Sequence, residues 1–155
     1  LGREAPASMA IRPLLEELAA RARETGVQAT VSSTDCVASA PPHALRRVLG
    51  NLLANAQRYG GGQPVELHAQ LEQGGVRIGV LDRGPGIPPE QLDAVFRPFH
   101  RVEPSRNPGT GGAGLGLAIV RQLAQANGWT VTLENRPSGG LAAWVLVEAA
   151  EAKES

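Results

Sequence analysis

The feature that most constrains this chain is a glycine-rich stretch, GTGGAGLGLAIV, that leads directly into an apolar helix pattern. Five glycines lie between Gly109 and Gly116, and the helical periodicity continues to Asn127. A glycine loop at the N-terminus of a helix leaves backbone N–H groups free, and the helix dipole favours an anion there. The stretch therefore indicates a phosphate-binding loop, with a simple glycine-rich linker as the alternative.

Two common phosphate loops do not fit this stretch. The dinucleotide fingerprint requires a strand directly before its glycines, but the preceding residues read HRVEPSRNP and cannot form a buried strand. A P-loop requires Gly-Lys-Ser/Thr, and no lysine follows Gly116. The loop therefore belongs to another architecture.

The pattern of helices and strands predicts one domain of the α+β class. The chain has 155 residues, of which 42% are hydrophobic and 3% aromatic, so one aliphatic core is expected. Periodicity and Pro/Gly boundaries predict helices over 13–26, 43–59, 88–95 and 115–127. Alternation predicts strands over 9–11, 27–32, 36–39, 65–71, 76–80, 131–135 and 141–147. The strands at 27–32 and 36–39 flank a turn at Thr34 and Asp35. The expected architecture is a two-layer α/β sandwich, a mixed sheet packed on about three helices.

We expect the folded domain to cover residues 8–148, with a disordered stub at 1–7 and a disordered tail at 149–155. Residues 99–113 have little periodicity and many Pro, Gly, Arg and Ser residues. Long loops without regular structure in compact domains are often lids over a ligand site. We therefore predict a mobile lid over 99–113.

Charge and composition limit the possible partners. The 15 Lys and Arg residues balance 15 Asp and Glu residues, which argues against a nucleic-acid-binding protein. The single cysteine excludes an internal disulfide, and the three histidines lack metal-ligand spacing. No apolar run is long enough to cross a bilayer, so we expect a soluble piece.

The helix expected over 43–59 carries a narrow polar stripe beside its apolar face. Asn51, Asn55 and Arg58 follow one another at about one helical turn. Amide oxygens suit Mg²⁺, which keeps substrate phosphates as its other ligands, and Arg58 is spaced to meet a phosphate. The alternative interpretation is a solvated polar face.

Asp82 continues the alternation of Val76, Ile78 and Val80, which places its side chain on the inward face of the strand. A buried carboxylate is costly unless it meets hydrogen-bond donors. Gly84 and Gly86 follow at once and allow the backbone to approach something flat. The exocyclic amine of adenine fits this pattern, whereas an Asp that closes a turn on its own backbone is the alternative.

Four motifs, NLLANAQRY, DRGPGIP, FRPF and GGAGLGLAIV, occur in the order of the N, G1, F and G2 boxes of sensor histidine kinases. Residues 10–147 thus resemble the ATP-binding domain of these kinases, a member of the wider gyrase, Hsp90, histidine-kinase and MutL (GHKL, Bergerat-fold) ATPases. NAQRYG and FRPFHR resemble kinases of the EnvZ type. Ala113 departs from the pattern, since many relatives carry Thr at this position.

The resemblance implies a role for each matching residue. Asn55 is implied as the Mg²⁺ ligand, with Asn51 beside the metal and phosphates, and Arg58 as a phosphate contact. The other implied ATP contacts are Tyr59 near the base, Asp82 as adenine reader, Gly84, Gly86 and Ile87 in its pocket, Phe99 and Arg101 of the lid, and Gly112, Gly114, Leu115 and Gly116 at the lid hinge.

Two absences favour a kinase over an ATPase. Related ATPases carry a water-activating glutamate one turn before the metal-binding Asn, and here that position is Asn51, which is no general base. The acceptor histidine of these kinases stands in a His-Asp/Glu-x-x-x-Pro setting, which His43, His68 and His100 all lack.

The resemblance therefore implies the catalytic fragment of a sensor kinase, which transfers the γ-phosphoryl of Mg-ATP to a histidine on separate dimerisation helices. It also implies a response regulator as partner, a monomeric fragment of a homodimeric protein, and a cytoplasmic domain of a bacterial inner-membrane sensor. The alternatives are a nucleotide-dependent regulatory module without kinase activity, and a serine kinase or ATPase of the same fold.

Overall fold

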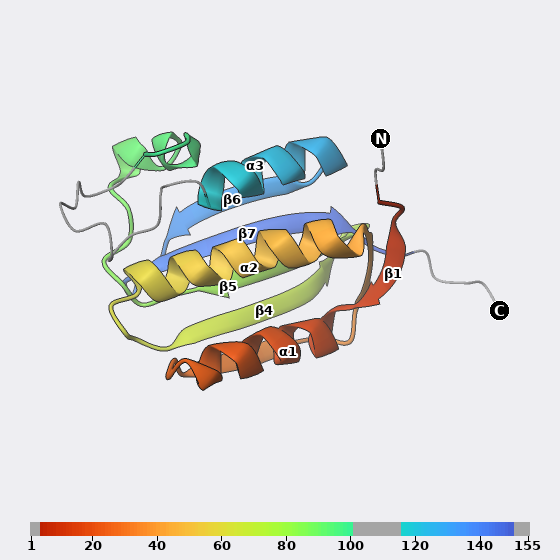
Figure 1. The fold of residues 1–155 in the computed structure, drawn as a ribbon, viewed down its shortest axis with the longest axis horizontal. Coiled ribbons are helices and arrows are strands. Elements are labelled where there is room, and N and C mark those ends of the chain that lie inside the picture. The colour runs from red at the N-terminus through yellow and green to blue at the C-terminus, as the bar shows by residue number, and fades with distance from the viewer. Residues whose placement is uncertain (1–3, 101–115, 151–155) are drawn as a thin grey trace.

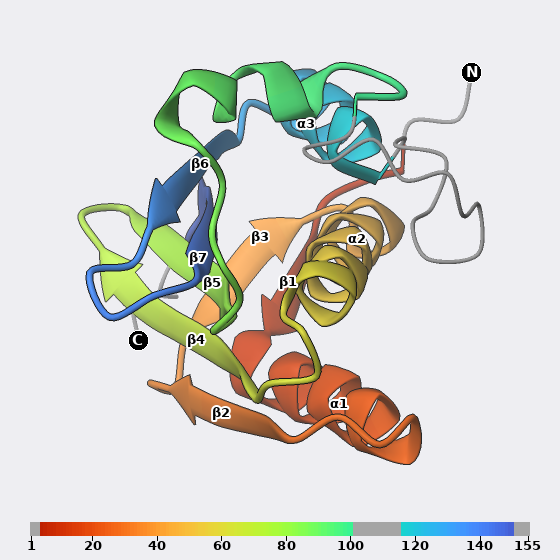
Figure 2. The ribbon, with the colours of Figure 1, turned by 90° about the vertical axis from the view of Figure 1, so that its left-hand side faces the viewer.

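The structure, a computed structural model, describes residues 4–100 and 116–150. Three helices cover one face of a five-stranded sheet, as Figures 1 and 2 show from two directions. The helices are α1 (Ile11–Glu24), α2 (Pro42–Tyr59) and α3 (Gly116–Asn127). The strands, in their order across the sheet, are β2 (Ala29–Ser33), β4 (Val65–Glu72), β5 (Gly75–Leu81), β7 (Leu141–Glu148) and β6 (Thr130–Asn135). The predicted two-layer α+β architecture is confirmed.

The sheet is mixed, as expected, because β2 pairs with β4 in parallel and the other neighbours are antiparallel. The strands on either side of Thr34 and Asp35 are not neighbours, however. β3 (Val37–Ala40) pairs with β1 (Ala7–Ala10) in a separate two-stranded sheet. The N–H of Thr34 still bonds the carbonyl of Ala69 on β4, so the turn carries the chain from one sheet to the other.

The ends of several elements differ from the sequence prediction. The expected short helix over 88–95 is instead two 3₁₀ turns, η1 (Pro89–Gln91) and η2 (Ala94–Phe96). The ordered backbone also extends past 8–148 at both ends. β1 begins at Ala7, and the N–H of Ala150 bonds the carbonyl of Val37.

The core lies between the sheet and α2. The predicted apolar stripe of this helix is confirmed, since its members are at most 6% exposed: Leu45, Val48, Leu49, Leu52, Leu53 and Ala56. The alternating residues of β4 and β5 that face them are also buried: Val65, Leu67, Val76, Ile78 and Val80. Among the residues that the structure describes, no helix is both long and apolar enough to span a membrane.

Leucines at the two extremes of burial test this core. Leu49 is fully buried on α2, whereas Leu71 at the end of β4 is 61% exposed. Leu49→Ala should lower the free energy of unfolding by about 2–5 kcal/mol, since it removes buried methyl groups and leaves a cavity. Leu71→Ala is the matched control and should cost well under half as much. Urea unfolding curves of both variants measure the difference, and equal losses would contradict the packing.

Candidate ATP-binding site

A cavity of about 740 Å³ opens where the C-terminal part of α2, the loop after β5 and the start of α3 meet. Ligand pockets for small molecules fall in this range of volume. The lining includes seven of the predicted site residues, namely Asn55, Arg58, Tyr59, Asp82, Gly86, Ile87 and Gly116. The tertiary structure thus brings together residues that the sequence placed on separate motifs.

The polar edge of α2 supplies one wall of the cavity. Asn55, Arg58 and Tyr59 line it, and the Arg58 guanidinium lies 5.9 Å from the centre of the Tyr59 ring. Asn51, one turn earlier, faces the start of α3. Its Nδ2 donates to the carbonyl of Arg47 at 2.9 Å, and its Oδ1 lies 3.5 Å from where a Cβ of Gly116 would stand. This geometry leaves the amide oxygen of Asn51 beside the helix N-terminus.

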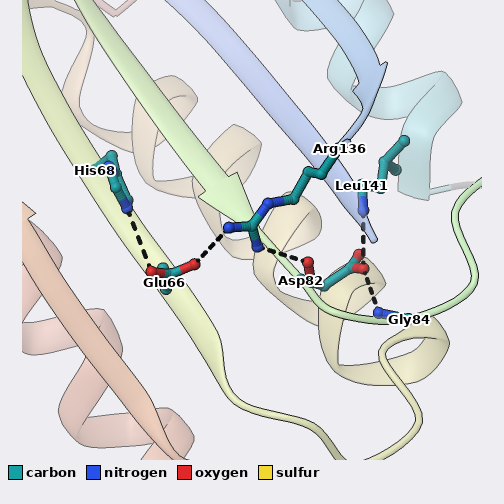
Figure 3. A network of polar contacts seen from close by, with 6 residues as sticks. All are labelled: Glu66, His68, Asp82, Gly84, Arg136 and Leu141. Carbon is teal, nitrogen blue, oxygen red and sulfur yellow. Dashed lines mark hydrogen bonds and ion pairs between the residues drawn. The ribbon is translucent and has the colours of Figure 1, made fainter. Parts of the chain in front are cut away.

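Asp82 is the buried carboxylate of the site, with 4% of its surface exposed. Its Oδ1 accepts hydrogen bonds from the N–H of Gly84 at 2.9 Å and from the N–H of Leu141 at 3.1 Å (Figure 3). The alternative interpretation, in which Asp82 closes a turn on its own backbone, is therefore met by the bond from Gly84, but this bond uses only Oδ1 of the carboxylate. Within the described part of the chain, Oδ2 has no hydrogen-bond partner, and Asp82 lines the cavity.

The glycines after Asp82 do approach other groups closely, but the groups belong to the protein itself. A Cβ on Gly84 would overlap the carbonyl oxygen of Tyr59, so this glycine lets the loop pack on the end of α2. Gly86 has a φ of +78° and abuts the side chain of Asn135. Gly84 and Gly86 thus hold the loop against α2 and β6, and Gly86 also lines the cavity. Their approach to a flat ligand stays a prediction.

The sequence interpretation missed a second set of site residues on and after β6. Asn135 clamps Ile87 through two bonds, since its Oδ1 accepts from the Ile87 N–H at 2.8 Å and its Nδ2 donates to the Ile87 carbonyl at 2.7 Å. Leu141 also lines the cavity. The sequence prediction contains Asn135 and Leu141 only as the ends of two strands, and the Asn-Arg pair shortly before two glycines is the available signal.

His100 is another lining residue that the sequence did not single out. Its Nε2 lies 3.1 Å from Oε1 of Gln91, which holds the ring against η1. The F-box expectation also included Phe99, but this side chain is 69% exposed and is not among the lining residues. The assigned role of Phe99 therefore stays a prediction, as do those of Arg101, Gly112, Gly114 and Leu115, which lie outside the described residues.

Comparison with known proteins identifies this arrangement. The family model for histidine kinase-, DNA gyrase B- and HSP90-like ATPases matches residues 40–151. The sensor histidine kinase component HK1 of Mycobacterium tuberculosis is 40% identical over 133 residues, which cover 85% of this chain and 77% of HK1. The chain belongs to this family, as a sensor histidine kinase domain.

Two further matches describe how far the likeness extends. The sensor-type histidine kinase PrrB of Mycobacterium tuberculosis is 40% identical over 110 residues, which are 71% of this chain but 24% of PrrB. The kinase domain thus spans about a quarter of that relative. The solved ATP binding domain of PrrB superposes with a TM-score of 0.78 at 30% identity and covers 96% of this chain and 100% of its own.

A pair of neighbouring glycines tests how the kinase domain holds Asp82. Gly139 and Gly140 have φ of +99° and +102°, so alanine is strained at both positions. At Gly140 the added Cβ would also overlap the carbonyl oxygen of Asp82, whereas at Gly139 nothing lies within 4 Å.

Gly140→Ala should therefore weaken nucleotide binding about tenfold or more by displacing Asp82, and Gly139→Ala should cost only the shared backbone strain of about 1 kcal/mol in stability. Calorimetric titration and thermal unfolding of both variants measure the contrast. Equal binding by the two variants would show that Gly140 does not support Asp82.

Proposed function

We propose that this domain binds Mg-ATP in the cavity, and that the whole kinase transfers the γ-phosphoryl group to a histidine on dimerisation helices outside this chain. The carrying observation is the buried Asp82 carboxylate, which lines the cavity with one oxygen bonded to backbone N–H groups and the other without a described partner. Asp82 lines the cavity, so a ligand that enters the cavity can donate a hydrogen bond to the free oxygen.

The base of the nucleotide suits the part of the cavity that Asp82 lines. Oδ2 of Asp82 would accept a hydrogen bond from the exocyclic amine of adenine. Ile87, Val95 and Leu141 line the same cavity and are at most 8% exposed, so they offer an apolar surface to the ring. Because Asn135 fixes the peptide of Ile87 at both its N–H and its carbonyl, this wall is rigid.

The phosphates suit the part of the cavity that Arg58 and Gly116, at the start of α3, line. A guanidinium and a helix N-terminus both stabilise negative charge. The amide oxygen of Asn55 is the donor that fits Mg²⁺, an ion that prefers oxygen ligands and substrate phosphates. The metal, when bound, offsets the charge that builds up on the transferred phosphoryl group.

The acceptor of the phosphoryl group lies outside this chain under this proposal. Asn51 has no carboxylate to activate water, so hydrolysis is poorly assisted. His68 lies on β4 beside Glu66 at 3.9 Å, and His100 is bonded to Gln91, and neither is in an acceptor motif. We accordingly assign the kinase domain, which includes residues 8–148, to a longer, homodimeric membrane sensor that serves a response regulator, with the domain itself monomeric and in the cytoplasm.

Base recognition is tested by Asp82→Asn. The amide should keep the bonds from Gly84 and Leu141 but present a donor to the adenine amine, so ATP affinity should fall about tenfold or more with the circular dichroism spectrum unchanged. Asp93→Asn removes the same charge from an 84% exposed side chain and serves as the matched control. Equal ATP affinity of wild type and Asp82→Asn in calorimetric titration would disprove the assignment.

The transfer reaction is tested by Asn55→Ala with γ-labelled ATP. The chain alone should hydrolyse ATP very slowly and carry no acid-labile phosphate, since it lacks both a general base and an acceptor histidine. With its dimerisation helices added, their histidine should become labelled, and Asn55→Ala should abolish this label.

Asn127→Ala, at the far end of α3, is the control and should transfer normally. Rapid hydrolysis by the chain alone would favour an ATPase. ATP binding without any transfer to the helices would favour a regulatory module.

A further inference from the structure

Arg136 lies behind Asp82, outside the cavity, directly after β6. Its side chain is only 18% exposed. Nη1 donates to the carbonyl oxygen of Asp82 at 2.8 Å, and Nη2 lies 2.9 Å from Oε2 of Glu66 on β4 (Figure 3). One guanidinium therefore joins the peptide of Asp82 to a strand on the far side of β5.

The remaining contacts of Asp82 come from its own loop and from the start of β7. Its N–H bonds the carbonyl of Leu141 at 2.9 Å, and its Oδ1 accepts from Gly84 and Leu141. The Arg136 N–H in turn bonds the carbonyl of Gly140 at 2.8 Å. Among these contacts, Arg136 alone supplies a charged donor and holds the carbonyl side of the Asp82 peptide.

We propose that Arg136 is a positioning residue for base recognition, which fixes the Asp82 peptide so that the free carboxylate oxygen keeps its direction into the cavity. Glu66 holds the guanidinium in place for this task. This inference rests on the proposed role of Asp82 as the acceptor for the adenine amine.

The position of Asp82 explains why its peptide needs such a support. β5 ends at Leu81, and the pairing with β7 reaches only the N–H of Asp82, which bonds Leu141. The loop then continues through Gly84 and Gly86, so strand pairing does not fix the carbonyl side of the Asp82 peptide. Hydrogen bonds weaken steeply as their angle departs from linear, so a small rotation of the Asp82 peptide misdirects its carboxylate. A charged donor on the carbonyl resists that rotation more strongly than a neutral one.

The ion pair with Glu66 gives Arg136 a structural contribution too, and the experiment must separate the two. Oε2 of Glu66 is buried and has no well-aligned hydrogen bond, although the Arg136 guanidinium is 2.9 Å away. Removing Arg136 therefore leaves a partly buried carboxylate without its partner and lowers stability. Stability alone cannot report on recognition, but discrimination between bases can.

The readout is the ratio of the affinities for ATP and for inosine triphosphate, which carries an oxygen where adenine carries its amine. Calorimetric titration of the 155-residue chain with each nucleotide and Mg²⁺ gives this ratio. Arg136→Gln should lower it about fivefold, chiefly through weaker ATP binding, because the Asp82 contact is made only with adenine. Arg136→Lys keeps the charge but cannot bridge both partners, and should fall between wild type and Arg136→Gln.

Two further variants complete the test. Arg77→Gln is the matched control, since Arg77 also points away from the helices, pairs with a glutamate (Glu134, 3.2 Å) and has no contact with Asp82. Its ATP preference should equal that of wild type. Glu66→Gln removes the anchor of the guanidinium without touching Asp82, and should lower the preference about twofold.

A wild-type ratio in Arg136→Gln, with thermal unfolding showing a folded variant, would overturn the proposal. If that variant fails to fold, wild-type ratios in both Arg136→Lys and Glu66→Gln would overturn it equally. Asp82→Asn separates this outcome from a failure of the proposed function. If Asp82→Asn also keeps the wild-type ratio of ATP to inosine triphosphate affinity, Asp82 does not recognise the base. If Asp82→Asn lowers this ratio and the Arg136 variants do not, only the role of Arg136 is disproved.

Discussion

The burial of one carboxylate, that of Asp82, organises the site and much of the chain around it. A charge that is 4% exposed must be met by donors, and here they come from separate parts of the fold. Gly84 belongs to the loop after β5, Leu141 begins β7, and Arg136 begins the turn between β6 and β7. Under the proposed function, the amine of the nucleotide base donates to the second carboxylate oxygen of Asp82, which has no hydrogen-bond partner in the described part of the chain.

The need to bring backbone groups close to Asp82 also explains two glycines near it, which contact different parts of the fold. Gly84 allows the loop to touch the carbonyl of Tyr59 at the end of α2, and Gly140 allows β7 to start against the carbonyl of Asp82. Neither is free to carry a side chain without displacing backbone. The loop, the helix end and the strand are therefore locked together, which gives the proposed base pocket a rigid frame.

Helix α2 links this frame to the core. Its apolar stripe packs on the sheet, and that packing sets the rotation of the helix. The rotation then carries Asn55 and Arg58 to the cavity and turns Asn51 toward Gly116 of α3. The polar edge of α2 thus directs the amide of Asn55 and the guanidinium of Arg58 toward the proposed phosphate site. The family to which the chain belongs contains histidine kinase-, DNA gyrase B- and HSP90-like ATPases.

The sequence by itself determined most of the helices and strands, the α+β class, the buried face of α2 and the inward direction of Asp82, because helical and strand periodicity are properties of neighbouring residues. Its ordered motifs also indicated the family. Only the tertiary structure decided that β2 and β3 enter different sheets and that Gly84 packs on protein. It also revealed the clamp of Asn135 on Ile87, 48 residues away, and the bond from Leu141 to Asp82, 59 residues away. Such partners leave no periodic trace in the chain, because their hydrogen bonds form only after the sheet has brought distant turns to the same edge.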